Sequence, residues 1–174
     1  IESSIEYGPW VAGGSVNKIL SNYPIEDSDI DIFVRDYAQI SRLTNLLSNL
    51  GFEREAYNNS STAWVKDPYG RLHVRRQTMY NEAAVSNWNG DFNHKSIKVQ
   101  VIEKVKYNSV HRLLGDFDFT IVQGATDGKR VLLHKDCIKD IDEKTLRFSG
   151  MPSRKTNLTT RLMKYTMRGY SCSN

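Results

Sequence analysis

Cysteines and long apolar runs are scarce in this sequence. No stretch approaches the roughly 20 apolar residues that cross a bilayer, and Cys137 and Cys172 are the two cysteines among 174 residues. Two thiols without a metal-binding spacing exclude a disulfide scaffold and a cysteine-rich zinc site, and they favour a reducing compartment, the cytoplasm. The N-terminal residues do not resemble a secretory signal. We therefore expect neither a membrane-spanning protein nor a membrane partner.

The composition is that of an ordinary globular protein. Hydrophobic residues make up 39% and charged residues 25% of the chain, which is typical of folded domains. The length suits one domain, with or without a short helical appendage. Because the chain starts at Ile1 rather than Met, we expect a domain of a larger polypeptide, with a processed chain as the alternative. The net charge of +4 suits a polyanionic partner, although most such excess is solvated surface charge.

Hydrophobic periodicity predicts an α+β fold. Residues 29–34 alternate between polar and apolar side chains, which is typical of a half-buried strand. Residues 38–50 carry apolar side chains at helical spacing and are followed by Gly51, a favourable helix end. Further helices are predicted at 15–23, 104–114, 135–142 and 154–169, further strands near 52–57, 61–66, 72–76, 98–102 and 130–133, and a loop over 81–95.

The pattern that carries chemistry is a glycine–serine turn, a helix and then two aspartates on a strand. Residues two apart on a strand point to the same face, so Asp29 and Asp31 converge on one site. Paired carboxylates repel each other unless a cation lies between them, and such oxygen ligands suit Mg²⁺ (or Mn²⁺) shared with substrate phosphates. Gly13 and Gly14 let a phosphate approach the backbone, and Ser15 opens a helix whose free N–H groups favour an anion.

Each half of this pattern also has an ordinary explanation. Asp-x-Asp is common on exposed strands, and Gly-Gly-Ser is common in loops. Their occurrence together, in this order and separated by a predicted helix, favours a functional site.

The pattern resembles that of the DNA polymerase β-like nucleotidyltransferase superfamily. Downstream, residues 118–121 (Asp-Phe-Thr-Ile) resemble the Arg-Arg-Asp-Phe-Thr-Ile-Asn motif of CCA-adding enzymes and bacterial poly(A) polymerases. Residues 138–147 resemble their Asp-Leu…Arg stretch, and residues 161–170 resemble the start of their neck helices. The resemblance implies a mixed sheet flanked by helices, with a nucleotidyltransferase domain over 1–150 and the start of a helical neck or C-terminal helix over 151–174.

Several positions depart from the resembled motifs. Asp116 and Phe117 replace the arginine pair, and Val122 replaces the asparagine, so Gln123 is the candidate polar contact to the nucleotide. A Glu-Asp-x-x-Arg neck motif, which reads the base in CCA-adding enzymes, is not evident. These departures leave the choice of base open.

The remaining candidates are acids and cations around the predicted site. Many members of the superfamily carry a third carboxylate on a neighbouring strand, where this sequence has Gln100. Asp118 is therefore the candidate third catalytic acid, with a structural aspartate as the alternative and Asp116 and Glu103 as other options. Lys129 and Arg130 are candidate substrate ligands, as are Arg75 and Arg76, although surface charge is the commoner role of such pairs. A basic stripe on the last helix is either a nucleic-acid contact or a solvated face; it comprises Arg161, Lys164 and Arg168.

The resemblance implies template-independent transfer of a nucleoside monophosphate from an NTP to an acceptor, by a mechanism with two metal ions. The first choice of acceptor is an RNA 3′ end. The alternatives are transfer to a protein or small molecule, and a non-catalytic module that binds nucleotide or RNA.

Overall fold

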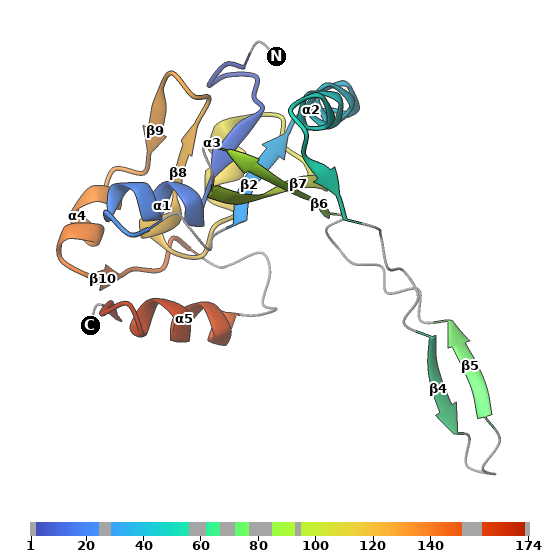
Figure 1. Ribbon diagram of the computed structural model, residues 1–174. Helices are drawn as coiled ribbons and strands as arrows, with labels where there is room; N and C mark the ends of the chain where they lie inside the picture. Colours follow the sequence, from blue (N-terminus) through green and yellow to red (C-terminus); the bar gives the residue numbers. More distant parts are fainter. Residues whose placement is uncertain are drawn as a thin grey trace.

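The main sheet is mixed and places the predicted aspartates near its centre. The computed structural model describes residues 3–24, 29–55, 62–66, 72–76, 85–92, 95–150 and 158–172. Seven described strands lie in the order β3-β6-β7-β2-β1-β8-β9 (Figure 1). The strands are β1 Trp10–Ala12, β2 Asp29–Val34, β3 Glu53–Arg54, β6 Val85–Phe92, β7 Lys95–Lys106, β8 Gly124–Thr126 and β9 Val131–Leu133. Strands β2 and β7 pair in parallel, whereas the other neighbours in this sheet are antiparallel.

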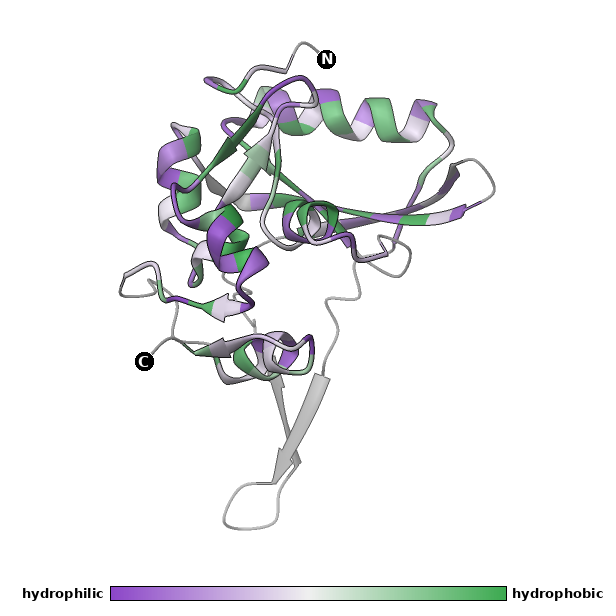
Figure 2. Ribbon diagram, turned by 90° about the vertical axis from the view of Figure 1, so that its left-hand side faces the viewer, coloured by the Kyte–Doolittle hydropathy of each residue, from purple (hydrophilic) through white to green (hydrophobic). Residues whose placement is uncertain are grey.

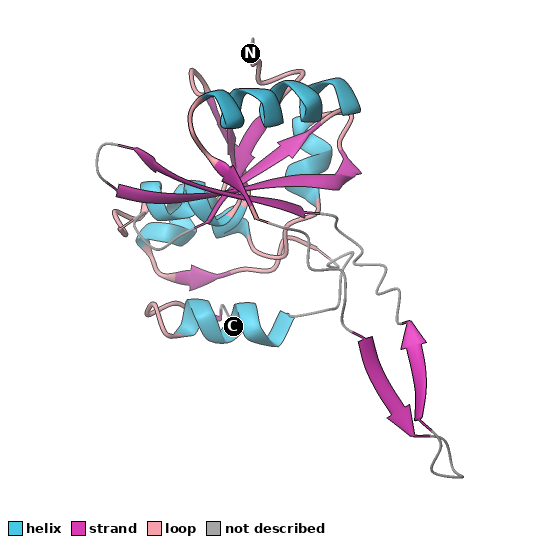
Figure 3. Cartoon of the chain, turned by 45° about the vertical axis from the view of Figure 1, so that its right-hand side comes forward, coloured by secondary structure: helices cyan, strands magenta, loops and turns pink. Residues whose placement is uncertain are grey.

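Helices and two small strand pairs complete the described chain (Figure 3). The helices are α1 Gly14–Leu20, α2 Tyr37–Asn49, α3 Val110–Gly115, α4 Cys137–Asp142 and α5 Leu158–Thr166, with a 3₁₀ turn η1 at Thr120–Val122. Strands β10 Thr145–Leu146 and β11 Ser171–Cys172 pair in parallel, and β4 Thr62–Lys66 and β5 Leu72–Arg76 form an antiparallel pair. The predicted α+β class is confirmed. The boundary predicted at residue 150 stays a prediction, because residues 151–157 lie outside the described residues.

The packing of α2 follows directly from its sequence pattern. Asp36 caps its start by accepting a hydrogen bond from the backbone N–H of Gln39. Leu43 and Leu47 are buried in a cluster with Val99 and Val101 of β7. Hydrophilic and hydrophobic residues alternate along this helix in Figure 2, so one side covers the sheet while the other faces solvent.

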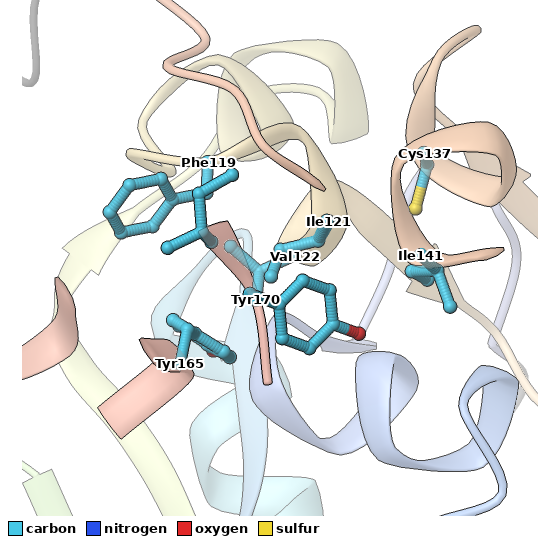
Figure 4. Packing of buried hydrophobic residues seen from close by; sticks show 8 residues of the cluster. Phe119, Ile121, Val122, Cys137, Ile141, Tyr165 and Tyr170 are labelled. Carbon is cyan, nitrogen blue, oxygen red and sulfur yellow. The ribbon is translucent and has the colours of Figure 1, made fainter. Parts of the chain in front are cut away.

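A second cluster joins α5 to the body of the domain. Figure 4 shows the rings of Phe119, Tyr165 and Tyr170 beside aliphatic residues of η1 and α4. The ring of Tyr165 packs edge-on against both others, with centroids 5.8 Å from Phe119 and 6.0 Å from Tyr170. This packing fixes the position of α5, and other residues of α5 lie near β2.

Two predictions about secondary structure are wrong. The loop predicted over 81–95 contains strand β6, which pairs along its whole length with β7. Its Gly90 marks close packing rather than a turn, because a Cβ there would lie 2.6 Å from the ring of Phe52. The helix predicted from residue 104 begins only at Val110, capped by Ser109, because β7 continues to Lys106. In the described part of the chain, no helix is both long and apolar enough to span a membrane.

Candidate active site

The turn after β1 requires one glycine for its backbone and leaves space beside the next. Gly13 has φ +77°, which side-chain-bearing residues rarely adopt, and a Cβ there would lie 3.0 Å from the ring of Phe117. A Cβ on Gly14 would meet no protein atom within 4 Å, and Gly14 lines a cavity. Packing therefore explains the first glycine, whereas the space beside the second is open to a ligand.

Ser15 connects α1 to the strand of the aspartates. It is buried, and its hydroxyl donates a hydrogen bond to the backbone carbonyl of Asp29 at 3.1 Å. The contact brings the start of α1 against the start of β2. The structure thus places the glycine–serine turn and the Asp-x-Asp strand side by side.

The two aspartates occupy different electrostatic environments. The Asp29 carboxylate accepts a hydrogen bond from Nε2 of Gln100 at 3.0 Å and lies 3.9 Å from Nζ of Lys98, both on β7. Asp31 faces the cavity, where burial, followed by the charge of Asp29, raises its pKa to about 6. Lys164 opposes this rise. A half-buried carboxylate beside a second carboxylate favours a cation between them.

The cavity has a volume of about 300 Å³ and lies between the sheet and α5. The sheet side contributes Asp31 and Phe33 of β2, and α5 contributes Arg161, Lys164 and Tyr165. Burial and the charge of Arg168 lower the pKa of Lys164, while Asp31 and Asp29 oppose this shift. The volume is at the lower end of the range for small-molecule sites.

Asp118 lines the same cavity and is tied to α5. It is buried, and its Oδ2 forms an ion pair with Nε of Arg161 at 2.5 Å. The predicted third acid therefore lies at the cavity, in contact with a cation from the last helix.

The other predicted site residues lie elsewhere. Gln123 is buried and donates through Nε2 to the carbonyl of Leu114 at 2.7 Å. Lys129 and Arg130 follow β8 in an exposed turn, where Arg130 forms ion pairs with Asp127 at 3.6 Å and Glu6 at 3.4 Å. None of these three lines the cavity.

The surroundings of the basic stripe were not apparent from the sequence. Two of its residues lie on α5, and Arg168 follows the end of that helix. Its spacing predicted a shared face, with nucleic acid or solvent as the neighbour. In the structure, Arg161 and Lys164 face the cavity, and the Arg168 guanidinium lies 5.6 Å from the ring centroids of Tyr23 and Tyr165. The spacing of charged residues along a helix shows which of them share a face. It does not show which strand that face will contact.

Among the residues that the structure describes, no group of three or more His, Cys, Asp and Glu side chains could hold a metal ion alone. Two carboxylates are nevertheless a suitable partial ligand set for Mg²⁺, which commonly takes its remaining ligands from water and substrate phosphates. The donor set around Asp31 fits that mode of binding.

The comparisons with known proteins identify a family. The model of the Gabija anti-defense 2 family matches residues 2–144. The chain belongs to the Gabija anti-defense 2 family. Gabija anti-defense 2 of Bacillus phage SPbetaL7 is 24% identical over 165 residues, which cover 94% of this chain and 34% of that protein. The chain thus spans about a third of the length of this curated relative.

Solved structures show how this member of the Gabija anti-defense 2 family is folded. A tRNA-processing enzyme in its apo form matches 95% of the chain and 39% of its own, with a TM-score of 0.57 and 16% identity. The Thermotoga maritima CCA-adding enzyme complexed with tRNA matches 95% of the chain and 35% of its own, with a TM-score of 0.56 and 16% identity. The predicted polymerase β-like nucleotidyltransferase fold, which is similar to the head of CCA-adding enzymes, is confirmed.

Proposed function

We propose that this chain is a catalytic domain that transfers a nucleoside monophosphate from an NTP to an acceptor, dependent on Mg²⁺ or Mn²⁺. The observation that carries the proposal is the placement of Asp29 and Asp31 on one strand face, beside an open Gly14 and opposite Lys164 of α5. Two carboxylates suited to a metal ion thus lie next to a backbone turn and an ammonium group, both of which are suited to phosphates. The fold, which is that of known nucleotidyltransferases, supports the same proposal.

Asp29 and Asp31 are the proposed metal ligands. These two residues would hold the metal, and its charge would supply a lowered pKa of the acceptor hydroxyl and neutralisation of the departing pyrophosphate. Gln100 and Lys98 hold Asp29 from the side of β7, while Asp31 is oriented into the cavity. A bound cation would offset the repulsion from Asp29, which together with burial, the larger cause, raises the pKa of Asp31.

Gly14 and Lys164 are the proposed contacts to the triphosphate. Gly14 leaves room at the backbone, and the ammonium group of Lys164 acts as a point charge on a flexible stem. Asp118 holds Arg161 and thereby places α5 over the cavity. In the reaction, the acceptor oxygen forms a bond to the α-phosphorus as the bond to pyrophosphate breaks, so catalysis depends on positioning and charge neutralisation.

The first candidate acceptor is the 3′ end of an RNA. One of the structures with this fold was solved with tRNA bound, and the match covers nearly the whole chain. The second candidate is a protein, because the curated relative is named for opposing a defence system, and a transferred nucleotide can inactivate a protein target. Both candidates use the same carboxylates and the same cavity.

The experiment follows label from each α-³²P-NTP, with Mg²⁺ or Mn²⁺, into either RNA or protein from a bacterial extract. We expect label in one fraction, sensitive to ribonuclease for an RNA acceptor or to protease for a protein acceptor. Asp31→Asn should remove it, whereas Asp142→Asn, which neutralises an exposed acid on α4, should not. NTP binding without labelling of either fraction would contradict the proposed chemistry and favour a binding module.

A further inference from the structure

The cavity contains a wall of aromatic side chains beyond its charged groups. On β2, Phe33 follows Asp31 on the same face, roughly 7 Å further along the strand. The Phe33 ring packs edge-on against Phe117 and Tyr107, with centroids 5.7 and 5.9 Å apart, and all three line the cavity. Charged groups suited to phosphates and an apolar wall thus lie along one cavity. An NTP has the same division between its triphosphate and its flat base.

Asp116 places a carboxylate at this aromatic wall. It lines the cavity, and its Oδ2 accepts a hydrogen bond from the hydroxyl of Tyr107 at 3.1 Å. An ionised carboxylate offers about four acceptor positions and no donor. In the part of the chain that the structure describes, this carboxylate accepts one hydrogen bond, from the Tyr107 hydroxyl. Acceptor capacity therefore remains beside the rings.

We propose that Asp116 reads the base of the bound NTP and selects guanine. This inference rests on the proposed function, which places the triphosphate at Asp31, Gly14 and Lys164. The Watson–Crick edge of guanine presents two adjacent N–H donors, which match the two oxygens of a carboxylate. Adenine and cytosine present a ring-nitrogen acceptor beside their amino group, so a carboxylate oxygen would face a lone pair. Uracil presents a single N–H between two carbonyl groups.

A contact between Asp116 and the base accounts for a departure from the resembled motif. Asp116 and Phe117 stand where the resembled enzymes have two arginines. A carboxylate at this position weakens phosphate binding, and the ring of Phe117 lies beside Gly13 and lines the cavity. Both changes suit contact with a neutral base better than contact with an anion. Lys164 and Arg161 supply positive charge from α5 instead.

The test measures the affinity of the purified protein for each of the four NTPs in the presence of Mn²⁺, with nucleotide transfer assayed in parallel. We expect GTP to bind about 10- to 100-fold more tightly than the other three, the discrimination typical of a bidentate contact to a base. Asp116→Asn keeps an acceptor for Tyr107 but offers one donor and one acceptor to the base. It should therefore abolish the preference for GTP and favour ATP or CTP. Asp142→Asn should keep the wild-type order.

The inference is overturned if the wild-type protein binds all four NTPs with equal affinity, or if a preference for GTP survives Asp116→Asn. A dependence on the ribose hydroxyls alone, seen as discrimination between GTP and dGTP without discrimination among bases, also overturns it. Guanine-selective binding without transfer would contradict the proposed function and leave the base contact intact. Transfer without base selectivity would contradict the base contact and leave the chemistry intact.

Discussion

Replacing Asp31 by asparagine should stabilise the metal-free protein at neutral and alkaline pH. Burial and the charge of Asp29 raise the pKa of Asp31 from 3.8 to about 6. At 1.36 kcal/mol per pKa unit, a shift of this size corresponds to about 3 kcal/mol of unfavourable free energy in the ionised, folded state. An amide of the same shape avoids that cost. We expect Asp31→Asn to gain about 2 to 3 kcal/mol at pH 8, or about 5 to 10 °C in unfolding temperature.

The pH dependence gives this prediction its sign. Below about pH 4 the Asp31 carboxyl is protonated in both the folded and the unfolded chain, so it contributes no difference. Between about pH 4 and 6 the folded state holds the Asp31 proton more tightly than the unfolded state does. The folding stability of the wild-type protein therefore falls as the pH rises through 6. The advantage of Asp31→Asn should therefore be absent near pH 4 and largest above pH 7.

Urea unfolding in EDTA at pH 4, 6 and 8 measures this difference, with Asp142→Asn as the control for loss of an exposed negative charge. Added Mn²⁺ should stabilise the wild-type protein at pH 8 through mass action and should have little effect on Asp31→Asn. If Asp31→Asn is no more stable than wild type at pH 8, or if its advantage is largest at pH 4, the electrostatic description of the site is wrong.

Four further substitutions test roles that the structure assigns to individual residues. Gly13→Ala should lower stability by about 1 to 3 kcal/mol, because its φ of +77° is strained for alanine; Gly14→Ala should change thermal stability little but weaken NTP binding in a titration. Lys164→Met should reduce NTP affinity about 10-fold and move the acidic limb of the activity–pH profile to higher pH, because Lys164 lowers the pKa of Asp31. Arg147→Ala should cost about 2 to 3 kcal/mol in urea unfolding while NTP affinity is retained, because it leaves the buried Asp140 carboxylate without its ion-pair partner.

Local patterns predicted the centre of the fold. The alternation over 29–34, the glycine turn at 13–14 and the apolar spacing over 38–50 each correspond to an element of the structure. These signals are strong because strand, turn and helix here agree with the intrinsic preferences of their residues. The resemblance built on them identified the fold.

Features that depend on contacts between distant parts of the chain were not predictable. Strand β6 contains two asparagines and a glycine, and its pairing with β3 and β7 together with the packing of Phe52 on Gly90 makes it a strand. The contact of Arg161 with Asp118 likewise depends on how α5 folds back over the sheet. Gln123, a polar residue one position from a motif, has a buried structural hydrogen bond instead of a place at the cavity.

The most direct test of the account compares the fate of the α- and γ-phosphates of one NTP. With Mn²⁺ and the extract fraction that accepts label, α-³²P should become covalently attached while γ-³²P is released as pyrophosphate. Single substitutions of Asp29 and Asp31 by asparagine should remove the transfer of α-³²P. Retention of γ-³²P on the acceptor, or undiminished transfer by either variant, would contradict the assignment of these carboxylates as the centre of a nucleotidyl-transfer site.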